Sequence, residues 1–193
     1  MSIHPTFDQL ISKSAFEKLL NQKASVFWLF GNSGSGKTTI ASSVQRILFE
    51  SGKYVVVLDG DNLRNGLNQS LGFSDEDRME NIRRAAEVCK MFMEHGAIVL
   101  ATFVCPKKEM RALANSIIGD SFYEIHIEAS LDTLMERDTK GFYKKAISGG
   151  MEQLTGVNAT FEIPENPSLV IQTDQINQEE SVQKLLNFVL NKI

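Results

Sequence analysis

Apolar residues gather in five short runs along the chain, and the segments between these runs carry apolar residues at helical spacing. The runs begin near residues 26, 54, 97, 121 and 169. Residues 54–58 are apolar without interruption and rich in β-branched side chains, as parallel strands covered on both faces are. Because strands that alternate with helices form parallel sheets, we predict one α/β domain in which a five-stranded parallel sheet has helices on both faces.

The predicted helices occupy most of the remaining chain. Their apolar side chains recur three and four positions apart, which places one apolar stripe on each helix. Gly52 and Gly96 fall where two helices should end, and Ser74 and Ser130 precede two others as candidate N-caps. The expected helices are residues 39–50, a short helix and turn in 63–70, then 75–95, 107–118, 130–137 and 179–192, with Ile40, Val44, Ile47, Leu48, Met79, Ile82, Ala86, Cys89, Phe92, Val182, Leu185, Leu186 and Val189 facing inward.

Residues 1–24 form an extension ahead of the first strand, and we expect an amphipathic helix over residues 5–21. Such a helix could cover an edge of the sheet or contact a partner, and the sequence does not choose between these roles. Its apolar side would carry Phe7, Leu10, Ile11, Phe16, Leu19 and Leu20.

Composition narrows the class of protein. The chain has 193 residues and a net charge of −4, and 42% of its residues are hydrophobic, which fits a single globular domain. The acidic balance argues against a general nucleic-acid binder, and the apolar runs are too short to span a membrane. The N-terminus lacks the features of a signal peptide, and Cys89 and Cys105 make no disulfide framework, so we expect a cytoplasmic location.

A glycine-rich loop lies between the first predicted strand and the helix after it, and it matches the phosphate-binding P-loop, G-x-x-x-x-G-K-[ST]. Glycines let the backbone approach a phosphate closely, and converging N–H groups with a helix N-terminus attract the anion. Lys37 would reach the β- and γ-phosphates of ATP, and the Thr38 hydroxyl would coordinate Mg²⁺. A Gly/Ser-rich connector is the alternative, but the flanking strand and helix favour a nucleotide site. The predicted ATP-binding residues of this loop are Gly31, Asn32, Ser33, Gly34, Ser35, Gly36, Lys37, Thr38 and Thr39.

Two carboxylates follow the second predicted strand, in Asp59-Gly60-Asp61-Asn62. Open α/β sheets bind ligands at the carboxyl ends of their strands, so these carboxylates should lie near the P-loop. We predict that they hold Mg²⁺, with Asp59 beside Thr38, and activate a nucleophile. Capping of the next helix is an alternative that is compatible with both roles.

Two polar segments complete the predicted site. Arg64, Arg78 and Asn81 form a cluster that could hold an anion, since arginine forks match phosphate and sulfate oxygens; for any one arginine a solvated surface position is the alternative. Residues 138–166 begin with a basic, glycine-punctuated stretch and continue as a polar segment. We interpret them as a mobile lid that brings positive charge over the phosphates, with an ordinary exposed loop as the alternative.

Several motifs together closely resemble the adenylylsulfate kinase (APS kinase) family. The resemblance covers about residues 26–172, in the family's order, and is more specific than the P-loop. The matching motifs are Asp59-Gly60-Asp61-Asn62-Leu63-Arg64-Asn65-Gly66-Leu67, Leu71-Gly72-Phe73-Ser74, Asp77-Arg78, Glu80-Asn81-Ile82-Arg83-Arg84, Arg137-Asp138 with Lys140-Gly141-Phe142-Tyr143-Lys144-Lys145-Ala146, Thr155-Gly156-Val157 and Pro164-Glu165-Asn166-Pro167.

The resemblance implies a P-loop kinase that transfers the γ-phosphate of MgATP to the ribose 3′-hydroxyl of adenosine 5′-phosphosulfate (APS), which yields ADP and 3′-phosphoadenylyl sulfate (PAPS). By matching position, it implies that Asp61 is the base and acts with Lys37, and that Arg137 lies near ATP. It also implies Mg²⁺ as the cofactor and a homodimer. The implied APS-binding residues are Asp61, Asn62, Arg64, Phe73, Arg78, Asn81, Val104, Cys105, Lys140 and Leu154.

Two positions depart from the family pattern. Cys105 stands where many members have serine, which excludes a phosphoserine there; a cysteine nucleophile is conceivable, although direct in-line transfer needs none. Leu154 stands where the family has a phenylalanine that stacks on the substrate adenine, a contact worth about 1–3 kcal/mol in other stacked sites. A kinase for another nucleotide acceptor, such as cytidine diphosphoramidate, is therefore one alternative. A nucleotide-binding switch without transfer activity is another.

Overall fold

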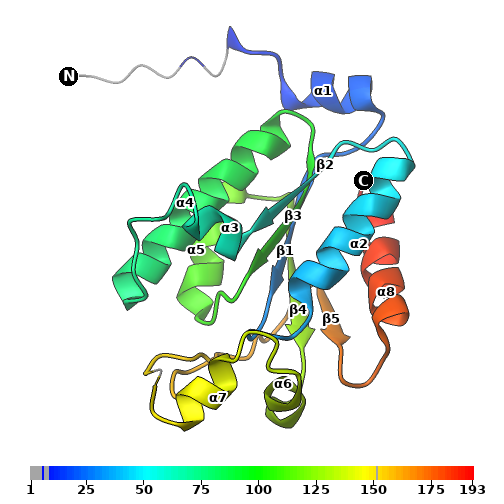
Figure 1. Cartoon of the computed structure of the whole chain (residues 1–193). Coiled ribbons are helices and arrows are strands. Elements are labelled where there is room, and N and C mark those ends of the chain that lie inside the picture. The colour runs from blue at the N-terminus through cyan, green and yellow to red at the C-terminus, as the bar shows by residue number, and fades with distance from the viewer. Residues whose placement is uncertain (1–5, 7–8, 151) are drawn as a thin grey trace, which may run out of the picture.

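Five parallel strands run through the centre of the molecule in the order β2-β3-β1-β4-β5 (Figure 1). The computed structural model describes residue 6, residues 9–150 and residues 152–193. The predicted sheet is confirmed, and β1 lies in its middle, so the loop that follows β1 emerges at the centre of the carboxyl edge. The strands are β1 (Ser25–Phe30), β2 (Val55–Asp59), β3 (Ile98–Phe103), β4 (Phe122–Glu128) and β5 (Leu169–Gln172).

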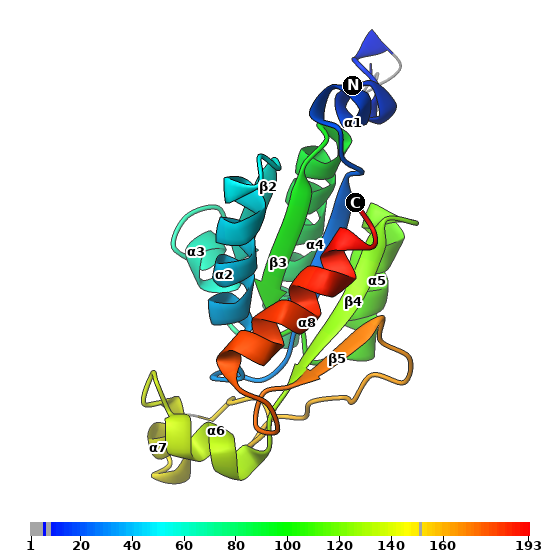
Figure 2. The ribbon, with the colours of Figure 1, turned by 90° about the vertical axis from the view of Figure 1, so that its right-hand side faces the viewer.

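Helices cover both faces of the sheet, as the alternation of strands and helices predicts (Figures 1 and 2). Alternate side chains of β1 explain how one strand serves two cores: Val26 and Trp28 pack toward α4 and α5, while Phe27 and Leu29 pack toward α2 and α8. All these side chains are buried. The covering helices are α2 (Lys37–Glu50), α4 (Asp75–Glu94), α5 (Lys108–Ile118) and α8 (Gln178–Leu190).

The burial pattern differs from the predicted one at two places. Only Val55 of β2 is fully buried, because β2 is an edge strand paired with β3 alone. Both faces of β2 are covered, as its continuous apolar run predicts: Val56 and Leu58 pack toward α4 and α5, and Val55 and Val57 pack toward α2 and α8. The difference is that Val56, Val57 and Leu58 are only partly buried. Ile47 of α2 is 39% exposed rather than inward, although its neighbours Val44 and Leu48 are buried in the core. In both cases the position of the element, and not its local pattern, sets the exposure.

The N-terminal helix α1 is shorter than predicted and covers the amino end of the sheet. It spans Lys13–Leu20 and begins after Ser12, whose side chain accepts a hydrogen bond from the N–H of Ala15. Residues 10–12 are not helical, so the prediction of one continuous helix over residues 5–21 is wrong. A Cβ added at Gly96 would lie 2.7 Å from a methyl carbon of Leu20, so the helix packs on the turn between α4 and β3. Leu10, Ile11 and Leu19 of the predicted apolar side are exposed, and Phe7 lies outside the described residues.

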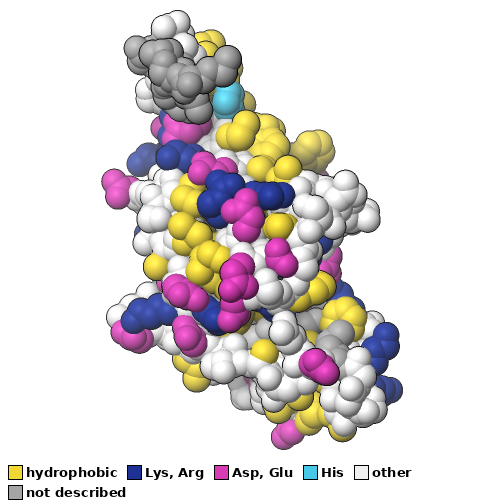
Figure 3. Space-filling view, turned by 90° about the vertical axis from the view of Figure 1, so that its left-hand side faces the viewer, with side chains coloured by type: hydrophobic (Ala, Val, Ile, Leu, Met, Phe, Trp, Pro, Cys, Tyr) yellow, Lys and Arg dark blue, Asp and Glu magenta, His cyan; other side chains and the backbone are white. Residues whose placement is uncertain are grey.

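The outer face of α4 carries ion pairs between neighbouring turns. The carboxylate of Glu80 forms ion pairs with Arg83 and with Arg84, and in each pair an oxygen of Glu80 lies 2.7 Å from the arginine Nε. Figure 3 shows the side of the molecule that lies on the left in Figure 1, and on it basic and acidic side chains lie among hydrophobic ones. Arg83 and Arg84 are thus occupied by Glu80, whereas Arg78, Asn81 and Ile82 of the same helix line the cavity described below.

Three short helices lie at the carboxyl end of the sheet. The chain continues directly from β2 into α3 because the Asp59 side chain caps that helix, so it begins before the predicted residue 63. The predicted lid segment contains α7, and it shares a small core with α6, made by Leu134, Tyr143, Ala146 and Leu154. Among the described residues, no helix is long and apolar enough to cross a membrane. The short helices are α3 (Gly60–Arg64), α6 (Leu131–Arg137) and α7 (Phe142–Ile147).

Candidate active site

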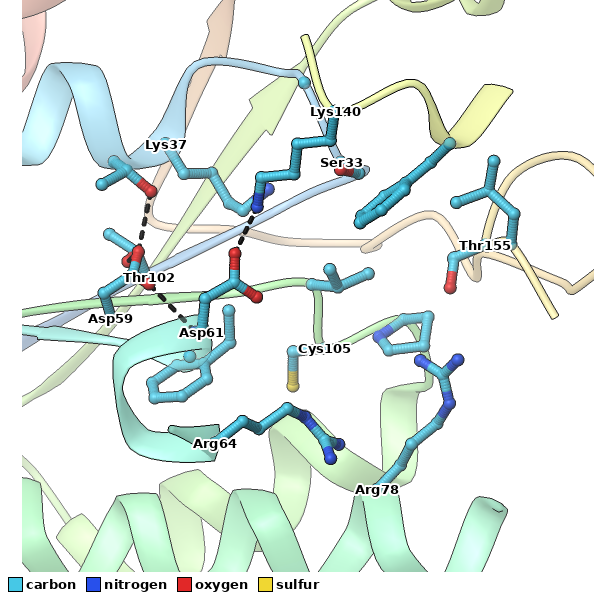
Figure 4. Close-up of a pocket in the computed structure, with 18 of the residues that line it drawn as sticks. Ser33, Lys37, Asp59, Asp61, Arg64, Arg78, Thr102, Cys105, Lys140 and Thr155 are labelled. Carbon is cyan, nitrogen blue, oxygen red and sulfur yellow. Dashed lines mark hydrogen bonds and ion pairs between the residues drawn. The ribbon is translucent and has the colours of Figure 1, made fainter. Parts of the chain in front are cut away.

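A cavity of about 610 Å³ opens at the carboxyl end of the strands, where sequence reasoning places the ligand (Figure 4). Its lining includes the P-loop, the β2–α3 junction, one face of α4 with Phe73 just before it, the loop after β3, Met110 of α5, and residues within 139–142 and 152–155. The P-loop lies at one end and the arginines of α3 and α4 lie at the other. A ligand with phosphates at one end and a second anionic group at the other would fit such a cavity.

The P-loop holds its lysine folded back onto the loop. Lys37 is buried, and its Nζ donates to the carbonyl oxygens of Gly31 at 2.9 Å and Asn32 at 2.7 Å. Burial, with repulsion from Lys140, lowers the pKa of Lys37 to about 8. Glycine is required at position 31, since a Cβ there would lie 2.1 Å from the carbonyl oxygen of Ile127 on β4. The loop therefore packs tightly against the sheet while its cation stays close to the cavity.

Asp59 links the P-loop to two strands. Its Oδ2 accepts hydrogen bonds from Thr38 at 2.8 Å and from Thr102 on β3 at 2.7 Å, and its Oδ1 accepts the N–H of Asp61 at 3.0 Å (Figure 4). Burial alone would raise the pKa of Asp59, but these hydrogen bonds outweigh it and hold the pKa below its usual value. The carboxyl group is therefore ionised at neutral pH, and it lies within hydrogen-bond distance of the Thr38 hydroxyl.

The oxygen atoms of Thr38 and Asp59 suit Mg²⁺, a hard cation that prefers oxygen ligands. The described part of the chain holds no cluster of three or more His, Cys, Asp or Glu side chains that could bind a metal. Magnesium in kinase sites typically takes one or two protein oxygens and completes its shell with phosphates and water. The donor set at the P-loop fits that pattern.

Asp61 lies in the middle of the cavity and contacts residues 138–166, the segment predicted to be a lid and called the lid below. It stands in the first turn of α3, 72% exposed, and its Oδ2 is paired with the Nζ of Lys140 (Figure 4). The two residues come from separate segments, and the pair closes the space between α3 and the stretch before α7. A carboxylate at this place could accept a proton from a hydroxyl that points at the P-loop.

The other end of the cavity carries two arginines and an aromatic ring. Arg64 donates to the carbonyls of Leu71 and Gly72, and its guanidinium lies 4.4 Å from the ring centre of Phe73. Arg78 donates to the carbonyl of Phe73 at 2.9 Å and to that of Gln153, in the lid, at 3.2 Å. Phe73 itself is 59% exposed. An anion and an aromatic base could both be bound here.

The floor of this end is formed by buried residues. Asn81 accepts a hydrogen bond from Asn68 at 3.0 Å, and both side chains are buried. Val104 and Cys105 follow β3; Cys105 has a left-handed backbone with φ of 42°, which is rare for a residue with a side chain. Burial raises the pKa of the Cys105 thiol to about 12, so it stays protonated at neutral pH. Leu154 lines the cavity but is 94% shielded from solvent by the small core of the lid, where it packs with residues such as Tyr143.

Five predicted residues lie outside the cavity lining of the described chain: Gly31, Asn32 and Ser35 of the P-loop, Asn62 and Arg137. Asn62 sits on α3, where its N–H bonds to Asp59 at 3.4 Å. Arg137 ends α6 and donates to the carbonyl of Thr173 at 2.6 Å, while the Thr173 hydroxyl bonds to the carbonyl of Ser35 at 3.0 Å. Arg137 is thus linked to the P-loop indirectly, through Thr173 in the loop after β5.

Sequence reasoning missed three residues of the site. Thr102 is the one polar residue of β3 and lies opposite Asp59 in the strand register, a signal that the sequence carried. Arg111 supports the Cys105 turn from below with bonds to the carbonyls of Cys105 at 3.3 Å and Pro106 at 3.2 Å. Tyr143 reaches the P-loop from the lid. Neither of the last two contacts has a signal in the local sequence.

Residues 23–172 match the family model described as adenylylsulphate kinase. The adenylyl-sulfate kinase of Bacteroides thetaiotaomicron is 45% identical over 192 residues, which make up 99% of this chain and 96% of that protein. The adenylyl-sulfate kinase of Bacillus licheniformis is 48% identical over 180 residues, 93% of this chain and 91% of that protein. Among solved structures, the Mycobacterium tuberculosis APS kinase CysC in complex with AMPPNP and APS is similar with a TM-score of 0.83 at 38% identity, covering 87% of this chain and 98% of that one. The family match spans both the P-loop and the lid.

Proposed function

Because this chain belongs to the adenylylsulphate kinase family, we propose that it transfers the γ-phosphate of ATP to the ribose 3′-hydroxyl of APS, forming PAPS and ADP. One observation carries the proposal: a single continuous cavity joins the P-loop to the Arg64–Phe73–Arg78 group, with Asp61 between them. A donor nucleotide and an acceptor nucleotide would meet at that carboxylate.

The P-loop end binds the donor. The N–H groups of the loop and the N-terminus of α2 attract the β- and γ-phosphates, and Lys37 turns from its own loop carbonyls to the phosphates. Thr38 and Asp59 would hold Mg²⁺, which neutralises charge on the phosphates during transfer. Arg137, already fixed on Thr173 behind the loop, would lie near the rest of the ATP molecule.

The arginine end binds the acceptor. Arg64 and Arg78 provide fork-shaped donors for the phosphosulfate, and Phe73 provides a face for the adenine. Asn81, Val104 and Cys105 form the floor and Leu154 lines the same end, while Asn62 follows Asp61 on α3, outside the cavity lining. This arrangement directs the ribose of the acceptor toward Asp61.

Asp61 is the base of the reaction. Its partner Lys140 is a flexible cation, and the oxygens of bound phosphates compete for it. Once Lys140 turns to the substrates, Asp61 accepts the proton of the 3′-hydroxyl as the new oxygen–phosphorus bond forms and the bond to the ADP oxygen breaks. Closure of residues 138–166 over both nucleotides would exclude water and so suppress hydrolysis of ATP.

The transfer is direct. The thiol of Cys105 is the only candidate nucleophile among the cavity-lining cysteines, and its pKa near 12 keeps it protonated and a poor nucleophile. An in-line displacement by the 3′-hydroxyl needs no covalent intermediate on the protein. Cys105 is therefore a small side chain of the acceptor floor.

The test is an acceptor comparison. Purified protein is supplied with MgATP and either APS, a cytidine diphosphate-type acceptor or no acceptor, and ADP and the phosphorylated nucleotide are quantified by chromatography and mass spectrometry. We expect ADP and PAPS to form in equal amounts, and only in the reaction that contains APS as the acceptor. Robust turnover of the cytidine acceptor without PAPS formation would assign the cavity to the alternative acceptor. Tight ATP binding without transfer to any acceptor would support a switch.

A further inference from the structure

A tyrosine of the lid holds a peptide of the P-loop. The hydroxyl of Tyr143, on α7, donates a hydrogen bond of 2.8 Å to the carbonyl oxygen of Ser33. The ring is 2% exposed and packs in the small core with Leu134, Ala146 and Leu154. The contact joins residues 110 positions apart and connects the lid helix to the loop that would surround the phosphates (Figure 4 shows Ser33 and the nearby Lys140).

The bond fixes the orientation of the Ser33–Gly34 peptide. In a planar trans peptide the C=O and the N–H point in opposite directions. With the carbonyl of Ser33 directed at Tyr143, the N–H of Gly34 points away from it, and Gly34 lines the cavity. In the described chain this N–H has no hydrogen-bond partner, so it is available to a phosphate oxygen.

Without the hydrogen bond from the tyrosine hydroxyl, the plane of the Ser33–Gly34 peptide could flip. Gly34 has φ of 80°, and a glycine tolerates both orientations of its peptide at small cost. The reversed peptide would present the Ser33 carbonyl oxygen to the phosphates and withdraw the N–H. The loop sequence alone therefore does not secure the binding orientation, and the contact from α7 does.

Tyr143 is itself firmly placed. Asp138 accepts hydrogen bonds from the backbone N–H groups of Tyr143 at 3.0 Å and Lys144 at 3.1 Å, which anchors the first turn of α7. Burial raises the pKa of Tyr143 to about 12, so its hydroxyl keeps its proton and remains a donor. The returning part of the lid also touches the P-loop, since a Cβ at Gly156 would lie 2.8 Å from the Nδ2 of Asn32. Lid residues thus contact two consecutive residues of the loop.

We propose that Tyr143 is a positioning residue that holds the Ser33–Gly34 peptide in its phosphate-binding orientation and couples the lid helix to nucleotide binding. Its role in turnover rests on the proposed kinase function, whereas its effect on nucleotide affinity does not need an acceptor. It touches no substrate in this arrangement and acts through the backbone of the loop.

The experiment compares Tyr143→Phe with Tyr123→Phe. The first removes the hydroxyl and keeps the buried ring; the second is a matched control, since Tyr123 packs beside Phe27 and Phe188, remote from the cavity lining. The dissociation constant of MgADP is measured by titration calorimetry with each full-length variant. We expect Tyr143→Phe to weaken MgADP about five- to tenfold, the usual effect of one hydrogen bond, and Tyr123→Phe to match the parent protein. Equal MgADP affinity in all three proteins would overturn the proposal, even if Tyr143→Phe lowered the melting temperature.

A second measurement uses the parent protein and does not depend on folding of the variant. Hydrogen–deuterium exchange is followed with and without MgAMPPNP and without acceptor. Slower exchange on nucleotide binding at the amides of α7, as well as in the P-loop, is expected; unchanged exchange in α7 would refute the coupling. If the parent protein shows this exchange pattern but does not turn over APS, the proposed acceptor is contradicted and the role of Tyr143 still holds. Normal APS turnover together with unchanged exchange in α7 would support the proposed acceptor and contradict the role of Tyr143.

Discussion

Arg111 is the most deeply buried charge near the acceptor floor, and its removal gives a prediction with a calculable size. The residue lies on α5 and is 3% exposed. Its Nε lies 3.3 Å from Oε1 of Glu124 on β4, its guanidinium lies 4.8 Å from the ring centre of Phe30, and its Nη1 donates to the carbonyls of Cys105 and Pro106. One side chain therefore neutralises a half-buried carboxylate and supports the left-handed turn at Cys105.

We expect Arg111→Met to be strongly destabilising. Methionine nearly fills the volume of the arginine stem but leaves Glu124 without its cation and two carbonyls without a donor. Removing one partner of a buried ion pair costs about 3–5 kcal/mol, and the 26% exposure of the Glu124 side chain places this case near the lower end, at about 3 kcal/mol. In a chain of 193 residues this corresponds to a fall in melting temperature of roughly 6–12 °C.

The loss of stability in Arg111→Met should be larger at high pH than at low pH. Burial raises the pKa of Glu124, and the charge of Arg111 partly opposes this rise, so the variant should have a still higher Glu124 pKa. A carboxyl group whose pKa is raised in the folded state destabilises the protein once the pH exceeds its unfolded value, and it costs nothing where both states are protonated. The stability deficit of Arg111→Met should therefore be full at pH 8 and shrink as the pH falls toward the ordinary glutamate value of 4.5.

The assay is urea unfolding followed by circular dichroism at pH 8 and pH 5. Arg111→Met combined with Glu124→Gln should recover part of the lost stability, because it removes the unpaired charge. Lys108→Met is the matched surface control: its pair with Glu165 is exposed on both sides and screened by solvent, so little change in stability is expected. An equal deficit for Arg111→Met at both pH values, with no recovery in the double variant, would refute the reasoning.

Three further predictions concern the site. Asp61→Asn should lower kcat about 10²-fold or more while MgADP affinity, measured by calorimetry, stays close to that of the parent; near-normal turnover would remove Asp61 from the role of base. Because the pKa of Lys37 is about 8 and bound phosphates should raise it, MgADP binding should take up protons near pH 8.5 and take up none through Lys37 at pH 6.5; calorimetry in buffers of different ionisation enthalpy that shows no uptake at the higher pH would contradict this. Cys105→Ala should remain folded and active in the APS assay, and the parent thiol should resist iodoacetamide at pH 7.5; an inactive, folded variant would reopen a covalent route.

Several features of the fold and site are local in the chain, and the sequence predicts them well. The P-loop is read from eight consecutive residues, and the strand and helix beside it are found as β1 and α2. Ser74, Ser130 and Gly52 mark helix ends because capping depends on neighbouring backbone groups. Asp59 is found at the carboxyl end of β2, within hydrogen-bond reach of Thr38, since all parallel strands of one sheet end at the same edge.

Exposure needs the neighbours of each element as well. The apolar run of β2 resembles a central strand, but its place at the edge of the sheet leaves it half-covered. The apolar residues of the N-terminal segment suggest a long helix, yet α1 begins only at Lys13 and buries none of its side chains fully. Periodicity reports what an element could bury, and the strand order and docking geometry decide what it does bury.

By itself, then, the sequence determined the class of fold and the phosphate loop, because each depends on patterns within a few positions of the chain, and it named the residues that we propose carry the chemistry. Only the tertiary structure decided which of these residues meet. Lys140 reaches Asp61 across 79 positions, Thr102 reaches Asp59 across 43, and Tyr143 reaches Ser33 across 110. Such pairs are set by strand order and by the packing of the small core that includes Tyr143, which sum over many weak contacts distributed along the whole chain. Apart from the single polar residue in β3, Thr102, they leave no pattern at the residues themselves.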